Sequence, residues 1–212
     1  MAERRKILVG VRDLIDSEIL GMASFKESEG VAGTGDAKCV LSCQCFAGRK
    51  HEGDENGKTS YRCGILTFIE QDPLIFTKYE LVYSDVRISP SQKESSSDFQ
   101  CSPSSVIVGR HHKGDENGQT YYYYRDIWVK KLLASDHTKI KLSCEEPDKK
   151  ECKESAGEWM QSPYTEDRFQ KYRAMTGRKH VGDENGKTYY EFTMFYFEVD
   201  ENGDIINPND SE

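Results

Sequence analysis

Polar residues able to bind a ligand recur three times at fixed spacing in this chain. The pattern G-R-x-H-x-G-D-E-N-G-x-T-x-Y begins at Gly48, Gly109 and Gly177, with starts 61 and then 68 residues apart, and ten of its 14 positions are identical in all copies. Carboxylates accept hydrogen bonds, Asn amides donate and accept them, and Arg and His add charge-assisted bonds. This combination suits a ligand that presents neighbouring hydroxyl groups, as a sugar does.

We therefore expect one binding site in each copy of the motif, with the Tyr ring offering its face to the C–H side of a sugar. Phe99 and Trp159 are further candidates for such an aromatic contact. The candidate ligand-binding residues are Arg49, His51, Asp54, Glu55, Asn56 and Tyr61 in the first copy, Arg110, His112, Asp115, Glu116, Asn117 and Tyr122 in the second, and Arg178, His180, Asp183, Glu184, Asn185 and Tyr190 in the third.

A purely structural interpretation of the motif stays open. Asn-Gly between two strands is typical of a two-residue type I′ turn, because both central residues of that turn need a positive φ. The Asp would then cap the turn, Arg and Glu would pair across the hairpin, and nothing would bind. The turn explains the Asn and the glycines, but it does not explain why Arg, His, Thr and Tyr recur.

A two-residue turn at Asn56-Gly57 also predicts the register of the first hairpin. In that register Arg49 and His51 share one face, since side chains alternate along a strand. Thr59 and Tyr61 share the opposite face. A bulge at the glycine that precedes the Asp would shift this register.

Metal sites fit the motif less well. A calcium loop of the EF-hand type needs an oxygen ligand at its fifth position, where the count from Asp54 gives Lys58, and it needs flanking helices. A looser calcium site at the hairpin tips is disfavoured by the nearby Arg. Zinc is disfavoured because the first and third copies contain one His each and no H-E-x-x-H pattern occurs. We expect no metal and no cofactor.

Catalysis is the weakest of the hypotheses. His, Glu, Arg and Tyr could act together as acid and base on a phosphodiester. An active site, however, normally gathers unlike residues into one cleft, whereas this motif occurs in three equivalent copies. No nucleophile elbow, P-loop or dinucleotide fingerprint is present. We therefore expect a protein that is not an enzyme.

The segments that flank the motif are predicted to be strands. Runs rich in aromatic and β-branched residues flank each copy, as is typical of strands. Each repeat also contains the same parts, with a short apolar strand first and a Lys-Glu-Ser tripeptide before the motif. The apolar strands are expected at 7–9, 81–83 and 140–142, and the tripeptides begin at Lys26, Lys93 and Lys153. Short helices are expected at 11–20 and 165–173.

These parts predict an all-β fold in a single domain, 1–212, made of three homologous repeats at approximately 1–72, 73–134 and 135–212. Each hairpin can bury only one face alone, so packing three around a pseudo-threefold axis would bury the apolar faces together. The repeats are long for a β-trefoil, and we expect a β-prism-like arrangement with the trefoil as the alternative.

Three homologous β repeats, each with a polar loop motif, resemble the pseudo-threefold lectins of the β-prism and β-trefoil classes. The resemblance is architectural and covers the whole chain. It implies a non-enzymatic, multivalent carbohydrate-binding protein whose partners are glycans or glycoconjugates, since three weak sites gain avidity on a dense glycan surface. A protein–protein interaction or toxin-associated module that uses the same hairpins is the alternative.

Composition narrows the partners further. The 212 residues include 37 acidic and 29 basic side chains, for a net charge of −8, so general binding to nucleic acid is not expected. No apolar run approaches the ~20 residues that span a membrane, and the first residues lack the apolar core of a secretory signal. Seven Cys is an odd number, so at least one is unpaired or pairs between chains. Buried thiols are the favoured interpretation, with a Cys39–Cys63 disulfide as the next option.

Overall fold

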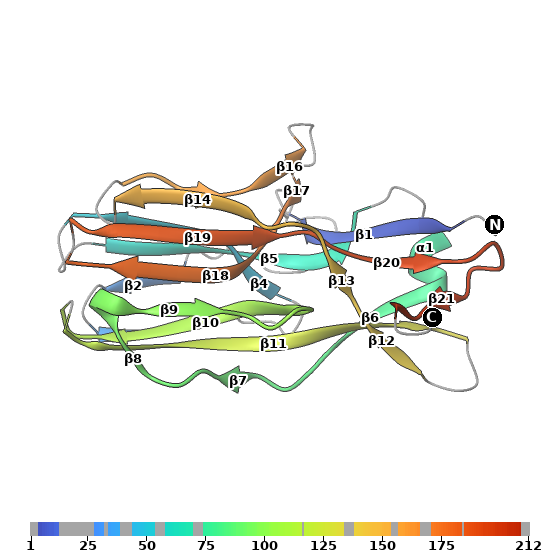
Figure 1. Cartoon of the computed structure of the whole chain (residues 1–212), viewed down its shortest axis with the longest axis horizontal. Helices are drawn as coiled ribbons and strands as arrows, with labels where there is room; N and C mark the ends of the chain where they lie inside the picture. Colours follow the sequence, from blue (N-terminus) through green and yellow to red (C-terminus); the bar gives the residue numbers. More distant parts are fainter. Residues whose placement is uncertain are drawn as a thin grey trace.

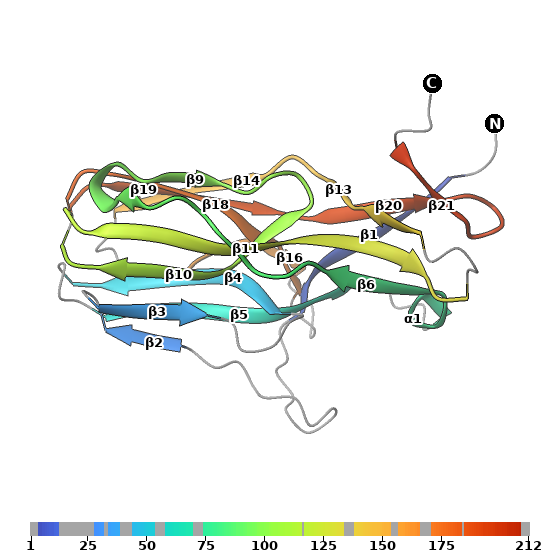
Figure 2. The same cartoon turned by 90° about the horizontal axis from the view of Figure 1, so that it is seen from below.

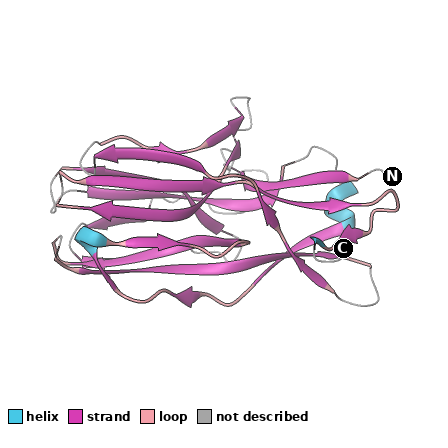
Figure 3. Cartoon of the chain, viewed as in Figure 1, coloured by secondary structure: helices cyan, strands magenta, loops and turns pink. Residues whose placement is uncertain are grey.

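The computed structural model describes residues 4–12, 28–31, 34–38, 44–53, 58–69, 74–115, 117–133, 138–153, 157–165, 171–183 and 185–208. Within these residues the protein is mostly β, as Figure 3 shows by colour, with several antiparallel sheets. This confirms the all-β expectation at the level of fold class. The two helical segments described are short: α1 (Leu74–Lys78) and the 3₁₀ turn η1 (Glu94–Ser96).

The described strands form three sheets. The largest contains β1 (Arg5–Arg12), β2 (Ser28–Val31), β4 (Gln44–Glu52), β5 (Lys58–Phe68), β13 (Ser143–Cys144), β15 (Met160–Gln161), β16 (Pro163–Thr165), β17 (Lys171–Tyr172), β20 (Phe195–Val199) and β21 (Ile205–Ile206). The second contains β3 (Thr34–Lys38), β6 (Tyr79–Tyr83), β7 (Arg87–Ile88), β8 (Gln92–Lys93), β10 (Ser105–Lys113), β11 (Gln119–Lys131) and β12 (Lys139–Lys141). The third contains β9 (Asp98–Gln100), β14 (Asp148–Lys153), β18 (Ala174–Val181) and β19 (Lys187–Thr193).

Each copy of the motif forms one hairpin: β4–β5, β10–β11 and β18–β19. The three hairpins share one register, in which the motif Arg lies opposite the motif Tyr and the His lies opposite the Thr. Each first strand also contains an irregularity just before the motif's first glycine. The predicted register is therefore wrong: Arg, His, Thr and Tyr share one face, because the turn is longer than two residues.

The turns explain this difference. The glycine before the Asp has a positive φ in every copy, at 96° in Gly53, 98° in Gly114 and 105° in Gly182. In the second hairpin, Oδ1 of Asp115 accepts a hydrogen bond from the Asn117 backbone N–H at 2.8 Å. The N–H of the next glycine donates to the Asp115 carbonyl, also at 2.8 Å.

The third hairpin makes the same two bonds at Asp183, at 2.9 and 2.8 Å. Among the described residues, Ser104 is the one residue other than glycine with a positive φ, so Asn117 and Asn185 do not form type I′ turns. The predicted turn type is wrong for these two hairpins, while the predicted capping role of the Asp is confirmed there.

In the second and third tips, the space around the last glycine leaves no room for a Cβ atom. A Cβ on Gly118 would lie 2.1 Å from the Lys113 carbonyl oxygen, and one on Gly186 would lie 2.2 Å from that of Val181. We expect Gly118→Ala and Gly118→Asn to cost similar amounts, about 2 kcal/mol, when measured by urea unfolding. Asn tolerates a positive φ better than Ala does. If Gly118→Asn lowers the free energy of unfolding clearly less than Gly118→Ala, the cause is backbone conformation and not steric overlap.

Strands from the segments that precede each motif join the hairpins to one another. β3 pairs with β10, placing Ala37 opposite Arg110. β9 pairs with β18, placing Phe99 opposite Arg178. β15 pairs with β4, placing Met160 opposite Arg49. The pairing is cyclic. The strand before the first motif joins the second hairpin, the strand between the first and second motifs joins the third, and the strand between the second and third motifs joins the first.

Two clusters of buried side chains fill the interior. One lies along β1, β5, β11 and β20 and includes Val9, Ile127 and Phe195. The other lies among the three hairpins and includes Phe46, Phe192 and the three motif tyrosines. Figures 1 and 2 show the turns of β10–β11 and β18–β19 at one end of the elongated molecule, with α1 and β21 at the opposite end.

The remaining expectations about short strands and helices are confirmed only in part. The three short apolar strands are found in β1, β6 and β12. The helix expected at 11–20 begins inside β1, and residues 13–20 lie outside the described residues. The helix expected at 165–173 overlaps the end of β16 and all of β17, and 166–170 are not described. In the described part of the chain, no helix has the length and apolar character needed to cross a membrane.

The cysteines divide into two groups. Cys63 is disulfide-bonded, so the interpretation of the cysteines as buried thiols is wrong for this residue. Cys39, its predicted partner, lies outside the described residues. Cys45, Cys101, Cys144 and Cys152 are not in disulfides, and of these Cys144 is exposed.

Candidate functional site

The three motif arginines reach across the interior to tyrosines of other copies. Each guanidinium Nη1 donates a hydrogen bond to the hydroxyl of a Tyr in a different hairpin. The bonds join Arg49 to Tyr190 at 2.6 Å, Arg110 to Tyr61 at 3.2 Å, and Arg178 to Tyr122 at 3.1 Å. These contacts close a cycle through all three hairpins, which we call the Arg–Tyr ring.

The Arg–Tyr ring is enclosed. Its six side chains belong to residues that are 1 to 6% exposed: Arg49, Tyr61, Arg110, Tyr122, Arg178 and Tyr190. Phe46 stacks on Tyr61 with ring centroids 4.5 Å apart, and Phe99 stacks on Tyr122 at 4.7 Å. Buried polar groups are costly unless they are hydrogen-bonded, and the ring supplies such partners. We therefore assign these residues a structural role.

Glu94 adds a carboxylate to this network. Its two oxygens lie 2.6 Å from Nη2 of Arg110 and 2.8 Å from Nη2 of Arg178, and its side chain is 8% exposed. Burial lowers the pKa of Arg110, but Glu94 outweighs this effect and leaves the pKa above its ordinary value, so the guanidinium is charged. Glu94 thus links the arginines of two hairpins.

The sequence analysis did not predict this role of Glu94, although its recurring tripeptide pointed to it. Glu94 is the central residue of the second Lys-Glu-Ser tripeptide, which served only to align the repeats. The equivalent residues, Glu27 and Glu154, lie outside the described residues. A Glu that recurs at the same place before a recurring Arg indicates a charge pair. A buried Arg requires such a partner.

The motif His and Thr are also turned inward. Nδ1 of His51 lies 2.7 Å from Oγ1 of Thr59, and Nδ1 of His180 lies 2.8 Å from Oγ1 of Thr188. The second copy differs, because Thr120 accepts a bond from Nε of Arg110 at 3.1 Å instead. These pairs hold the two strands of each hairpin together at the base of the tip.

His112 consequently has a different environment, with Nδ1 3.7 Å from Oε2 of Glu94. Burial and the neighbouring Arg110 lower the pKa of His112 from 6.5 to about 4, against an opposing effect of Glu94. Burial would raise the pKa of Tyr61, but Arg110 and Arg49 outweigh it, and the pKa of this phenol lies below its ordinary value. Among the described residues, positive charge therefore dominates the surroundings of Tyr61 and His112.

The lowered pKa of His112 predicts how stability depends on pH. The unfolded chain takes up a proton near pH 6.5 and the folded chain only near pH 4, so the folded state loses about 3 kcal/mol of stability as the pH falls through this window. Stability from this group is fully present above pH 6.5. We expect His112→Gln to remove that part of the slope in urea unfolding between pH 7 and 4. A Lys113→Gln control should retain it, and an unchanged slope in His112→Gln would refute the assignment.

The exposed part of the motif is the tip. Asp115, Asn117, Asp183 and Asn185 are exposed to solvent, and Asp54, Glu55, Asn56, Glu116 and Glu184 lie outside the described residues. Figure 1 shows that β4 ends and β5 begins at the same end of the molecule as the other two tips. The structure therefore separates the candidate residues: Arg, Tyr and most of the His side chains are interior, and among the described candidates the Asp and Asn of the second and third tips are exposed.

A fourth D-E-N-G sequence supports this division. It lies between β20 and β21, where Oδ1 of Asp200 accepts from the Asn202 backbone N–H at 2.9 Å. The Gly203 N–H donates to the Asp200 carbonyl at 3.0 Å. This turn has no motif Arg, His, Thr or Tyr around it in sequence. D-E-N-G is thus sufficient as a turn, and the inward-facing residues of the motif serve a separate purpose.

The other aromatic candidates are also placed. Phe99 is buried against Tyr122 and belongs to the interior. Trp159 is half-buried, and the guanidinium of Arg62 lies over its ring at 4.1 Å. Within the described residues, no group of three or more His, Cys, Asp or Glu side chains is placed to hold a metal ion.

Comparison with protein-family models, with curated proteins and with solved structures returns no match to this chain.

Proposed function

We propose that this chain is a non-enzymatic, multivalent carbohydrate-binding protein that presents three motif tips at one end. One observation carries the proposal: the same 14-residue motif ties the hairpins together through its buried Arg and Tyr, and in its second and third copies it leaves the Asp and Asn exposed. A rigid base and a polar tip are what a preorganised binding site needs.

We also propose that the three hairpins are related by a pseudo-threefold axis through the Arg–Tyr ring, in a β-prism-like rather than a β-trefoil arrangement. The cyclic Arg-to-Tyr bonds support this proposal, as does the cyclic pairing of β3, β9 and β15 with the next hairpin. Such an arrangement would fix the spacing of the three tips, so that one surface could engage all of them with avidity.

Sugars fit the exposed residues of the tips. The Asp carboxylate accepts hydrogen bonds, and the Asn amide both donates and accepts them, as neighbouring sugar hydroxyls require. Each such site would be weak by itself, because exposed polar groups also form hydrogen bonds with water. Three sites held at fixed spacing would recover affinity on a repetitive glycan surface.

The direct test is a broad glycan array probed with labelled, folded protein, with and without EDTA. We expect selective binding that free sugar competes away and that EDTA does not change. Sensitivity to EDTA would instead favour a calcium site at the tips. A blank array from folded protein would refute carbohydrate binding, and capture of a protein partner without sugar competition would favour the protein-binding alternative.

A further inference from the structure

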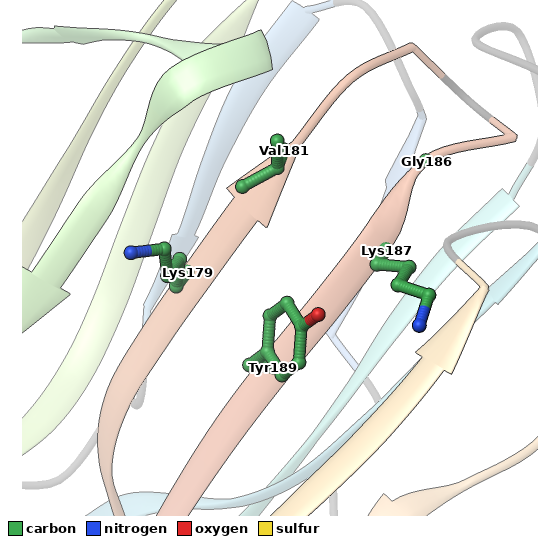
Figure 4. A pocket seen from close by; sticks show the side chains of 5 residues that line it. All are labelled: Lys179, Val181, Gly186, Lys187 and Tyr189. Carbon is green, nitrogen blue, oxygen red and sulfur yellow. The ribbon is translucent and has the colours of Figure 1, made fainter.

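A shallow pocket lies on the outward face of the third hairpin, beside its tip. It has a volume of about 580 Å³ and is lined by Lys179, Val181, Gly186, Lys187 and Tyr189. Gly186 belongs to the D-E-N-G turn of the third motif, so the pocket adjoins the exposed part of the motif. Figure 4 shows the Tyr189 ring on the same face as the side chains of Lys179, Val181 and Lys187.

The rim of this pocket offers hydrogen-bond donors and acceptors together. Nζ of Lys179 lies 2.8 Å from Oδ2 of Asp98, and both side chains are at least half exposed. Nζ of Lys187 lies 2.6 Å from Oε1 of Glu151, again as an exposed pair. Exposed ion pairs contribute little to stability, so these groups can exchange a partner for a ligand at small cost.

The corresponding faces of the other two hairpins differ. Tyr189 lies opposite Lys179 in the third hairpin, and Tyr121 lies opposite His111 in the second. The His111 ring stacks on Tyr121 with centroids 4.5 Å apart and an interplanar angle of 9°, so it occupies that aromatic face. The first hairpin has Ser60 at this position, with no ring. Of the three hairpins, the third therefore combines an open Tyr ring with flanking charged groups.

We propose that Tyr189 is the stacking platform of a binding site for a neutral pyranose, with Lys179, Lys187, Asp98 and Glu151 as its polar rim. This inference rests on the proposed carbohydrate-binding function and names the ligand class and the site in the third repeat. The C–H face of a pyranose packs on an aromatic ring, and its vicinal hydroxyls both donate and accept.

The charge balance of the rim selects against an anionic sugar. Each ammonium group is matched by a carboxylate at 2.8 Å or less, so a sulfate or carboxylate on the ligand would meet Asp98 and Glu151 as well as the lysines. The net charge of the chain, −8, adds to that repulsion. A neutral sugar meets neither obstacle.

The test compares wild type, Tyr189→Ala, Tyr189→Leu and Tyr121→Ala on matched neutral and sulfated pyranosides, after circular dichroism has verified the fold of each protein. We expect binding of neutral pyranosides to weaken about tenfold in both Tyr189 variants and to persist in Tyr121→Ala. Tyr189→Leu removes the aromatic ring but retains an apolar side chain. Comparing it with Tyr189→Ala therefore separates the effect of losing the ring from the effect of losing apolar packing.

Each other outcome is decisive. Unchanged binding in both Tyr189 variants would overturn this site and leave the proposed function standing. Preference for sulfated over neutral sugars would overturn the ligand class. Wild-type protein that binds no pyranoside on the array would overturn the proposed function together with this inference.

Discussion

Glu94→Ala is expected to destabilise the protein by about 3–5 kcal/mol, the range for breaking a buried ion pair by removing one partner. The carboxylate of Glu94 lies within 2.8 Å of both Arg110 and Arg178, and all three side chains are enclosed. Removing it takes away the negative charge that links two buried guanidinium groups. The measurement is the free energy of unfolding from urea titration at pH 7.

The matched control is Glu80→Ala, which removes a Glu from an exposed pair. Nζ of Lys130 lies 3.0 Å from Glu80, whose side chain is 49% exposed. Exposed pairs contribute about 0–1 kcal/mol, so this variant should unfold close to wild type. If the two variants lose the same small amount, the Arg–Tyr ring does not depend on Glu94 and its structural role must be abandoned.

Arg178→Met is expected to be comparably severe, again about 3–5 kcal/mol. Its guanidinium bonds Glu94 through Nη2 and the Tyr122 hydroxyl through Nη1, so the change leaves a buried carboxylate and a buried hydroxyl short of a donor. The adjacent variant Lys179→Met makes a similar change on the opposite face, where the side chain is half exposed. It should cost at most about 1 kcal/mol.

A single comparison by thermal unfolding therefore separates the two faces of one strand. Arg178→Met should lower the melting temperature by many degrees, and Lys179→Met by few. Equal effects would mean that Arg178 does not act through the buried contacts described above. The pair of variants differs by one position in the chain, so differences in strand propensity are small.

The sequence was sufficient to predict the three motif hairpins because aromatic and β-branched runs flank the Asn-Gly of each motif. It was not sufficient to predict the turn. Asn-Gly favours a type I′ turn in isolation, but Gly114 with a φ of 98° and the Asp115 side chain produce a longer tip. The hydrogen bond of the Asp115 side chain overrides the local preference of Asn-Gly for a type I′ turn. The glycine before the Asp is the sequence feature that indicates the longer tip.

The inward position of the arginines could not be predicted from residue type, since Arg is rarely buried without a partner. Arg110 is buried because Glu94 and Tyr61 both reach it, and these residues come from other segments of the chain. Recurrence in three copies indicates that the spacing of these residues is constrained. A bound ligand and a buried network would constrain that spacing in the same way, so recurrence does not distinguish them. The cyclic contacts depend on tertiary packing, which sequence spacing alone does not encode.

The most direct test of the central claim measures glycan binding by the triple variant Asn56→Ala, Asn117→Ala and Asn185→Ala beside Asn202→Ala. Ala retains the backbone N–H that Asn117, Asn185 and Asn202 donate to their turns, so we expect circular dichroism to show an intact fold for both proteins. The account predicts that the triple variant loses binding at an unchanged melting temperature while Asn202→Ala binds like wild type. Wild-type binding by a folded triple variant would contradict it.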